Sequence, residues 1–280
     1  MKKIYTIFLA MVFIAGLAIT MYPFISNAIN TKKQNQVIDN YDNLVRKKDT
    51  KYIEDELAKA HRYNDLVATS GSFSSYIMEN DADYNSVLNI GGDGVMGYVT
   101  IPGINVQIPI YHDTKESTLQ VAAGHLKGSS LPVGGKSTHC VIAAHRGLPS
   151  ANLFTNLDEL KKGDLFWVSV LGKKITYEVD EISIVSPGDL DKLQIVEEQD
   201  YCTLMTCTPY GINTHRLLVR GKRIIEYDGN YEMDKTYMSD RVKLTTFIIA
   251  PFVIVMLIGM LVMKRMRKKK KGKRVENNED

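Results

Sequence analysis

The chain has 280 residues, 44% of them hydrophobic, which is enough for one medium-sized domain with appendages. Its formal net charge of +3 comes from the two ends, because 11 of the 35 Lys and Arg lie at residues 2–3 and 264–274. Residues 4–263 carry 24 basic and 29 acidic side chains, a net charge of −5. A mildly acidic body argues against a nucleic-acid-binding function.

The first 31 residues predict a membrane anchor or a secretory signal. Two lysines, Lys2 and Lys3, precede an uncharged stretch at 4–31. Ser26-Asn27-Ala28 has the small-x-small form of a cleavage site, so removal of this segment is one reading. The apolar run is long for a signal peptide, and we therefore favour a retained anchor.

A second membrane span is expected near the C-terminus. Residues 244–263 contain no charge, and a 20-residue helix is about 30 Å long, which spans the hydrocarbon core. A basic run at 264–271 follows, opening a tail at 264–280 that we assign to the cytoplasm. Both basic flanks then lie inside the cell, and the intervening residues, from about 32 to 240, face outside.

Between the two ends, three regions differ in their pattern. Residues 32–88 predict a helical extension in which Asp49-Thr50 could cap a second helix, with a polar, poorly periodic loop at 69–85. Residues 89–228 contain short apolar runs separated by Gly, Pro and Ser, which predict strands. Residues 229–243 are polar and lead into the second span.

The strand pattern predicts the fold class. We expect a mainly β domain, a closed antiparallel or mixed barrel with short helical insertions near 117–122 and 151–160. The expected strands are 96–101, 106–111, 139–144, 165–170, 175–184, 201–206 and 217–225.

The three cysteines do not form a disulfide framework. Cys140 and Cys202 each lie in an apolar run and are interpreted as small buried hydrophobic residues, with a bridge between them as a minor alternative. No CxxC motif is present, and no second His follows the first at i+4, so no metal site and no cofactor are expected.

Three side chains at the ends of expected strands could act on a carbonyl group. Cys207 ends the run 201–206 and is followed by a Pro-Tyr-Gly turn; His145 ends an apolar run at 141–144; Arg216 begins the next strand. A thiol, an imidazole and a guanidinium can supply a nucleophile, a general acid–base and an oxyanion donor. His215 would point to the opposite face of its strand. Arg146 could help bind substrate, but solvation at the surface is the preferred interpretation.

These segments resemble the catalytic motifs of sortases, the membrane-anchored cysteine transpeptidases of Gram-positive bacteria. The matching segments are AAHRG at 143–147, TLMTC at 203–207 and NTHRL at 213–217, within a similarity that runs from about Asn89 to Ile225. The segments GDGVMGY at 92–98, SSLPVGG at 129–135 and TCTPYG at 206–211 resemble the class C, pilus-assembling branch. A helical N-terminal extension and a second membrane helix fit the same branch.

The resemblance implies a sortase-type barrel and a reaction. Cys207 would cleave an LPxTG-like sorting signal at its Thr–Gly bond and form a thioacyl-enzyme. His145 would protonate the leaving amine and then deprotonate the incoming one, and Arg216 would bind the oxyanion. The partners would be secreted pilin subunits, with a pilin lysine as the acceptor, at the outer face of the membrane. A cell-wall cysteine hydrolase and a non-catalytic, membrane-tethered binding module are the alternatives.

One departure from the resemblance concerns the active-site lid. Class C relatives carry an Asp-Pro-aromatic triplet in the N-terminal extension, and this chain has no proline between residues 24 and 101. Phe73 and Asp83-Tyr84 are possible stand-ins. We expect a site that is open or weakly guarded, so that deleting residues 69–85 would not markedly raise turnover.

Overall fold

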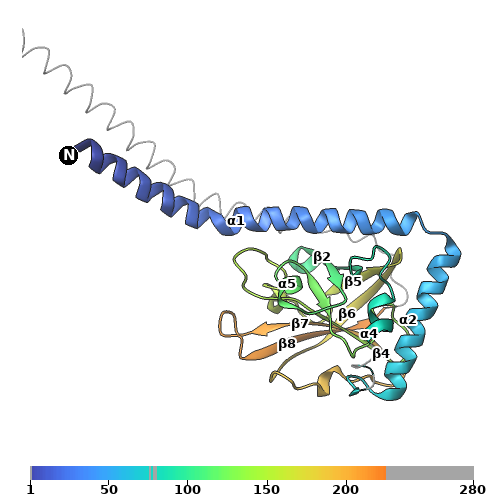
Figure 1. Cartoon of the computed structure of the whole chain (residues 1–280). Helices are drawn as coiled ribbons and strands as arrows, with labels where there is room; N and C mark the ends of the chain where they lie inside the picture. The colour runs from blue at the N-terminus through green and yellow to red at the C-terminus, as the bar shows by residue number, and fades with distance from the viewer. Residues whose placement is uncertain (1, 76, 78–80, 225–280) are drawn as a thin grey trace, which may run out of the picture. The chain divides into compact units, whose positions relative to one another are not determined.

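A closed eight-stranded β-barrel forms the centre of the computed structural model, which describes residues 2–75, 77 and 81–224 (Figure 1). Neighbouring strands follow the order β1-β2-β3-β4-β7-β8-β6-β5 around the barrel. The strands are β1 (Val95–Ile101), β2 (Val106–Tyr111), β3 (Ala123–His125), β4 (Thr138–Ala143), β5 (Leu165–Val170), β6 (Lys173–Val185), β7 (Asp200–Thr208) and β8 (His215–Arg223).

Most strand pairs are antiparallel, but β2–β3 and β4–β7 are parallel. The parallel β4–β7 pair brings the carboxyl ends of two strands, about sixty residues apart in sequence, to the same edge of the sheet. The predicted barrel is therefore confirmed as a mixed one. The sequence prediction missed β3, which has only three residues and no alternation. A Cβ at Gly124 of β3 would lie 2.1 Å from the carbonyl oxygen of Asp113, so only glycine allows this close approach.

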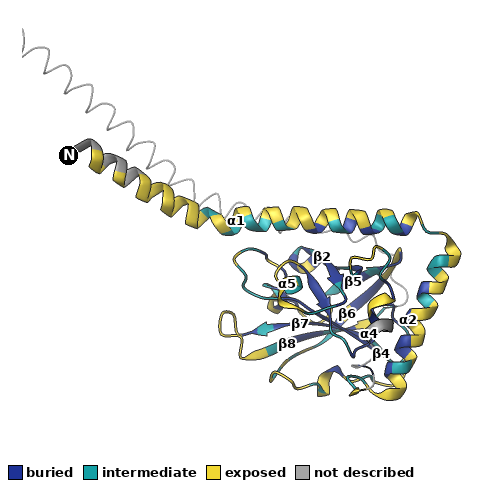
Figure 2. Ribbon diagram, in the orientation of Figure 1, coloured by how far each residue is buried: buried dark blue, intermediate teal, exposed yellow. Residues whose placement is uncertain are grey.

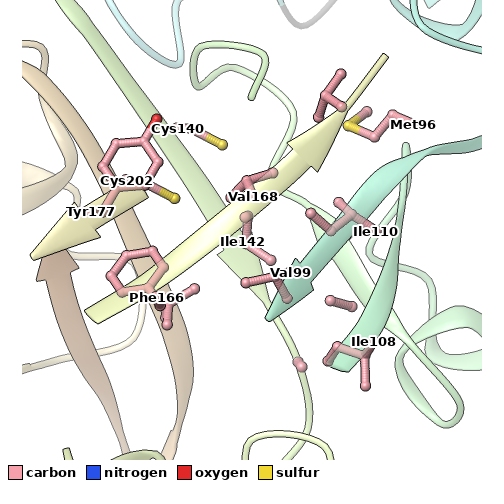
Figure 3. Close-up of a cluster of buried hydrophobic side chains, with 14 of the residues drawn as sticks. Met96, Val99, Ile108, Ile110, Cys140, Ile142, Phe166, Val168, Tyr177 and Cys202 are labelled. Carbon is pink, nitrogen blue, oxygen red and sulfur yellow. The ribbon is translucent and has the colours of Figure 1, made fainter. Parts of the chain in front are cut away.

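Buried apolar side chains from all eight strands fill the barrel interior. Figure 2 marks the buried parts of the strands, and Figure 3 shows part of this cluster. Cys140 and Cys202 are paired in register on β4 and β7 and are 2% and 0% exposed, beside Tyr177 in the close-up view. Both cysteines are free, as the sequence interpretation preferred. Burial raises the pKa of the Cys202 thiol well above its usual range, which keeps this thiol protonated and unreactive.

Two long helices precede the barrel: α1 (Lys2–Arg46) and α2 (Thr50–Ser70). The Asp49 side chain caps α2 as predicted, accepting a hydrogen bond from the backbone N–H of Tyr52 at 2.7 Å. Tyr41 joins α1 to the barrel, because its hydroxyl donates to the carbonyl of Met96 and accepts from the N–H of Leu171, both at 2.9 Å. The helix α1 runs without a break across residue 31, where the sequence analysis divided the chain.

The N-terminal part of α1 has the character of a membrane span. Among the described residues, the segment Met11–Arg46 is the one helix whose length and mean hydropathy of 1.7 suit a membrane crossing, and its most apolar window is not buried. The expected second span at 244–263 and the basic tail at 264–280 lie outside the described residues.

The segment after α2 returns to the barrel instead of forming only a surface loop. It ends in a short helix, α4 (Asp81–Ser86), on which Tyr84 is 2% exposed. The Tyr84 hydroxyl lies 2.6 Å from the carbonyl oxygen of His112 and 2.7 Å from Nδ1 of His125. Tyr84 is therefore part of the core.

Another short helix, α5 (Glu116–Leu119), lies between β2 and β3, and 3-10 turns occur at η1 (Pro102–Ile104), η2 (Leu157–Glu159) and η3 (Asp191–Leu193).

Candidate active site

The candidate site lies where β4 and β7 leave the barrel side by side. Beyond the end of β4, the N–H of Ala144 donates to the carbonyl of Met205 at 3.1 Å, and the Thr206 hydroxyl donates back to the carbonyl of Ala144 at 2.7 Å. The chain positions that follow this contact are His145 and Cys207. The parallel register thus brings the two predicted residues to the same level of the sheet.

Arg216 comes from the strand on the other side of β7. It is the cross-strand partner of Cys207 in the antiparallel β7–β8 pair, so both side chains emerge on one face. Its Nη1 donates to the carbonyl of His215 at 3.1 Å. His215 is exposed, pairs with Thr208 and lies on the opposite face from Arg216, as the strand alternation predicts. The register therefore places all three predicted residues at one end of the β4–β7–β8 sheet.

Glu116 on α5 contacts His145 and was not singled out from the sequence. The Nε2 of His145 lies 3.1 Å from both carboxylate oxygens of Glu116, and the imidazole side chain is 24% exposed. Hydrogen bonds from Gln120 and His145 hold the pKa of the Glu116 carboxyl below its usual range. A carboxylate only accepts, so Nε2 carries a proton in this arrangement.

Arg146 is buried, contrary to the expectation that it is solvated at the surface. Its side chain is 7% exposed; Nη2 lies 2.5 Å from Oδ2 of Asp158, and Nη1 donates to the Thr208 hydroxyl at 3.2 Å. The guanidinium carbon also lies 5.8 Å from the centre of the Tyr210 ring. The sequence showed an arginine beside His145, but its partners lie 12 to 64 residues away and no local pattern marks them.

A buried apolar cluster adjoins the candidate site on the same face of the sheet, and its central residues Val141, Leu193 and Leu218 are at most 2% exposed. Met205 and Leu218 are cross-strand partners two residues from Cys207 and Arg216, and they pack with Val141 of β4. Phe73 from the segment after α2 also packs against this cluster. The cluster is completed by Leu126, Val185, Leu190 and Leu193.

No group of three or more His, Cys, Asp or Glu side chains suited to a metal ion occurs within residues 2–75, 77 and 81–224. The chemistry available at the candidate site is that of a thiol, an imidazole, a guanidinium and a carboxylate.

Comparison with known proteins identifies the family. The sortase domain model matches residues 99–224. The crystal structure of sortase C1 from Streptococcus agalactiae is 49% identical, superposes with a TM-score of 0.66, and is matched over 69% of this chain and 100% of that one. The chain belongs to the sortase family, in its class C branch. A lid mutant of the same S. agalactiae sortase matches at 44% identity, with a TM-score of 0.62, over 68% of this chain and 98% of that one.

More distant relatives support the same assignment. Sortase A of Bacillus anthracis is 26% identical over 79% of this chain and 94% of its own length. Sortases are cysteine transpeptidases that act at the cell surface on proteins bearing a sorting signal. This sortase is therefore an enzyme, which removes the non-catalytic binding module from the alternatives raised by the sequence.

Proposed function

We propose that this sortase polymerises pilin subunits, with Cys207 as nucleophile, His145 as general acid and base, and Arg216 as the oxyanion donor. The observation that supports the proposal is the strand register, which places these three residues at the neighbouring ends of β4, β7 and β8. They lie beside the buried apolar cluster against which Phe73 packs, which becomes the peptide surface for a sorting signal in this proposal once Phe73 moves aside.

Each residue has a chemical task in the proposed reaction. The Cys207 sulfur attacks the Thr carbonyl of an LPxTG-like signal, and Arg216 donates hydrogen bonds to the oxygen that becomes negative. The C–N bond breaks as His145 protonates the leaving Gly amine, which leaves a thioester on Cys207. His145 then takes a proton from a pilin lysine amine, which attacks the thioester to form an isopeptide bond and release the thiol.

Phe73 is proposed as a weak guard of the peptide surface. It packs against the cluster that contains Met205 and Leu218, and its N–H donates to the carbonyl of Gly128 at 2.9 Å. The hydroxyls of Ser72 and Ser74 are buried without a hydrogen-bond partner in the described part of the chain. A segment held by one aromatic ring and few polar contacts is expected to move aside at small cost.

The membrane arrangement follows from the charged flanks. We place the catalytic domain, residues 89–228, and the helical extension, residues 32–88, outside the cell. A retained anchor at 1–31 and a span at 244–263, joined to the domain through the juxtamembrane segment 229–243, would leave both basic flanks in the cytoplasm.

The test uses a purified pilin that carries both an LPxTG-like signal and an acceptor lysine. The enzyme is expected to produce a ladder of covalent pilin multimers on a denaturing gel, with a Thr–Lys isopeptide bond found by mass spectrometry. Cys207→Ala should yield no ladder, whereas Cys140→Ala should retain it because Cys140 is a buried core residue.

The same assay separates polymerisation from the hydrolase alternative. A pilin whose acceptor lysine is replaced by arginine should give cleaved monomer only slowly, because water is a poor acceptor in the proposed site. Equal cleavage with and without an amine acceptor would show that the enzyme is a hydrolase.

A further inference from the structure

Two side-chain hydrogen bonds join β7 to the residues that follow β4. One lies just before, and the other just after, the chain positions of His145 and Cys207. On one side, the Thr206 hydroxyl donates to the carbonyl of Ala144 at 2.7 Å. On the other side, Arg146 donates to the Thr208 hydroxyl at 3.2 Å. The backbone positions of His145 and Cys207 therefore lie between these two hydrogen bonds.

The Arg146 contact ties together three segments that are separate in sequence. Besides Thr208, its guanidinium binds Asp158, which lies on the 3-10 turn η2 next to the fully buried Leu157. Tyr210, from the loop after β7, lies over the same guanidinium. The turn after Arg146 requires Gly147, whose φ is +78° and whose Cβ, if present, would lie 3.0 Å from the Tyr210 ring.

Folding stability alone does not account for this arrangement. Removing a guanidinium from water is costly, and the partner carboxylate of Asp158 is 48% exposed. The Nε of Arg146 is also buried with no hydrogen-bond partner among the residues the structure describes. An apolar residue of similar volume at position 146 would stabilise the fold equally well. The planar guanidinium of arginine, in contrast, holds Thr208 and Asp158 in defined directions.

We infer that Arg146 is a positioning residue that sets the geometry of the Cys207–His145 pair by joining Thr208 to Asp158. It acts through its neighbours and does not touch the substrate. The inference rests on the proposed function, in which these two residues react in turn with the same acyl group.

The experiment compares Arg146→Met, Arg146→Lys and Asp158→Asn with the wild-type enzyme on a sorting-signal peptide with an amine acceptor. Arg146→Met is expected to lower kcat about 100-fold, because small displacements of reacting groups have effects of that size, and to leave KM within about twofold. Arg146→Lys should recover part of kcat, and Asp158→Asn should fall between Arg146→Lys and the wild type.

The matched control is Arg220→Met. The Arg220 side chain is 20% exposed, pairs with Asp180 at 2.7 Å, and lies four residues further along β8 from Arg216. The Arg220→Met substitution should lower the melting temperature without lowering kcat. If Arg146→Met lowers the melting temperature to the same extent and leaves kcat unchanged, or if only KM rises, Arg146 has no positioning role.

A second readout needs no substrate and so separates this inference from the proposed function. The rate at which iodoacetamide alkylates Cys207 is expected to fall in Arg146→Met and to be unchanged in Arg220→Met. An unchanged rate in Arg146→Met overturns the inference. Absence of any peptide adduct on wild-type Cys207 would instead overturn the proposed function and leave the alkylation comparison valid. Arg146→Lys and Asp158→Asn, which keep the charge or the volume, provide the same comparison if Arg146→Met does not fold.

Discussion

At the scale of single residues, the proposed oxyanion role of Arg216 depends on the shape of its side chain as well as on its charge. Arg216→Lys keeps the charge and removes the fork, so we expect kcat to fall about 10- to 100-fold, near the lower part of the range for loss of an oxyanion donor. Steady-state kinetics on a sorting-signal peptide measure the change. Arg220→Lys is the control, and retention of full turnover in Arg216→Lys would remove the oxyanion role.

Glu116 is expected to contribute modestly, because its contact with His145 is at the surface. Its side chain is 67% exposed, and exposed ion pairs have small effects that salt screens. Glu116→Gln should therefore lower kcat/KM less than about fivefold at low salt, with no difference from wild type near 1 M salt. Glu198→Gln, which breaks the exposed pair with Lys136, is the control. A large loss that salt does not alter would mean that Glu116 takes part in the chemistry directly.

At the scale of elements, strand β4 contains a buried histidine that makes stability depend on pH. Burial lowers the pKa of His139 to about 4, while its Nδ1 faces the carbonyl of Gln194 at 2.9 Å and its Nε2 the hydroxyl of Thr203 at 2.7 Å. The unfolded chain binds this proton near pH 6.5 and the folded chain only near pH 4. The free energy of unfolding should therefore fall as the pH drops from 6.5 to 4, by at most about 3 kcal/mol.

Denaturant unfolding at several pH values measures this effect. His139→Gln should flatten the pH dependence between 6.5 and 4, and the exposed His215→Gln should leave it as in wild type. The same slope in His139→Gln and wild type would show that other groups cause the acid instability.

The proposed guard, Phe73, lies in the segment between α2 and α4, which also contains core residues. The guard therefore has to be tested by a point substitution and not by deleting the segment. Deleting residues 69–85 would remove Ile77 and Tyr84, which are 1% and 2% exposed, and would disturb the core. Phe73→Ala changes only the ring on the peptide surface, and we expect it to raise kcat/KM by less than about tenfold. An increase of 100-fold or more would show a tightly closed lid in place of a weak guard.

The sequence predicted those elements whose signals are local. Seven strands follow from apolar runs between turn residues, and Asp49 follows from the preference of helix starts for Asp. The sequence did not predict β3, because its three residues have no alternation and its pairing depends on Gly124 approaching Asp113. The burial of Arg146 and the Glu116–His145 contact could not be predicted either, since both depend on loops brought together only by the closed barrel.

At the scale of the whole molecule, helix α1 connects the candidate membrane span to the catalytic domain. The helix continues from its apolar N-terminal part to Tyr41, whose hydroxyl bridges β1 and the residue after β5. A continuous helix with a buried contact restricts the distance between the anchor and the barrel more than a flexible linker would.

The most direct test of the account is the intact mass of the domain after incubation with an LPxTG-type peptide in the absence of an amine. We expect one added mass equal to the peptide acyl group, mapped to Cys207 by fragmentation, released by an added amine and absent in Cys207→Ala. A stable adduct on Cys140 or Cys202, or cleavage of the peptide by Cys207→Ala, would contradict the assignment of the nucleophile and with it the proposed mechanism.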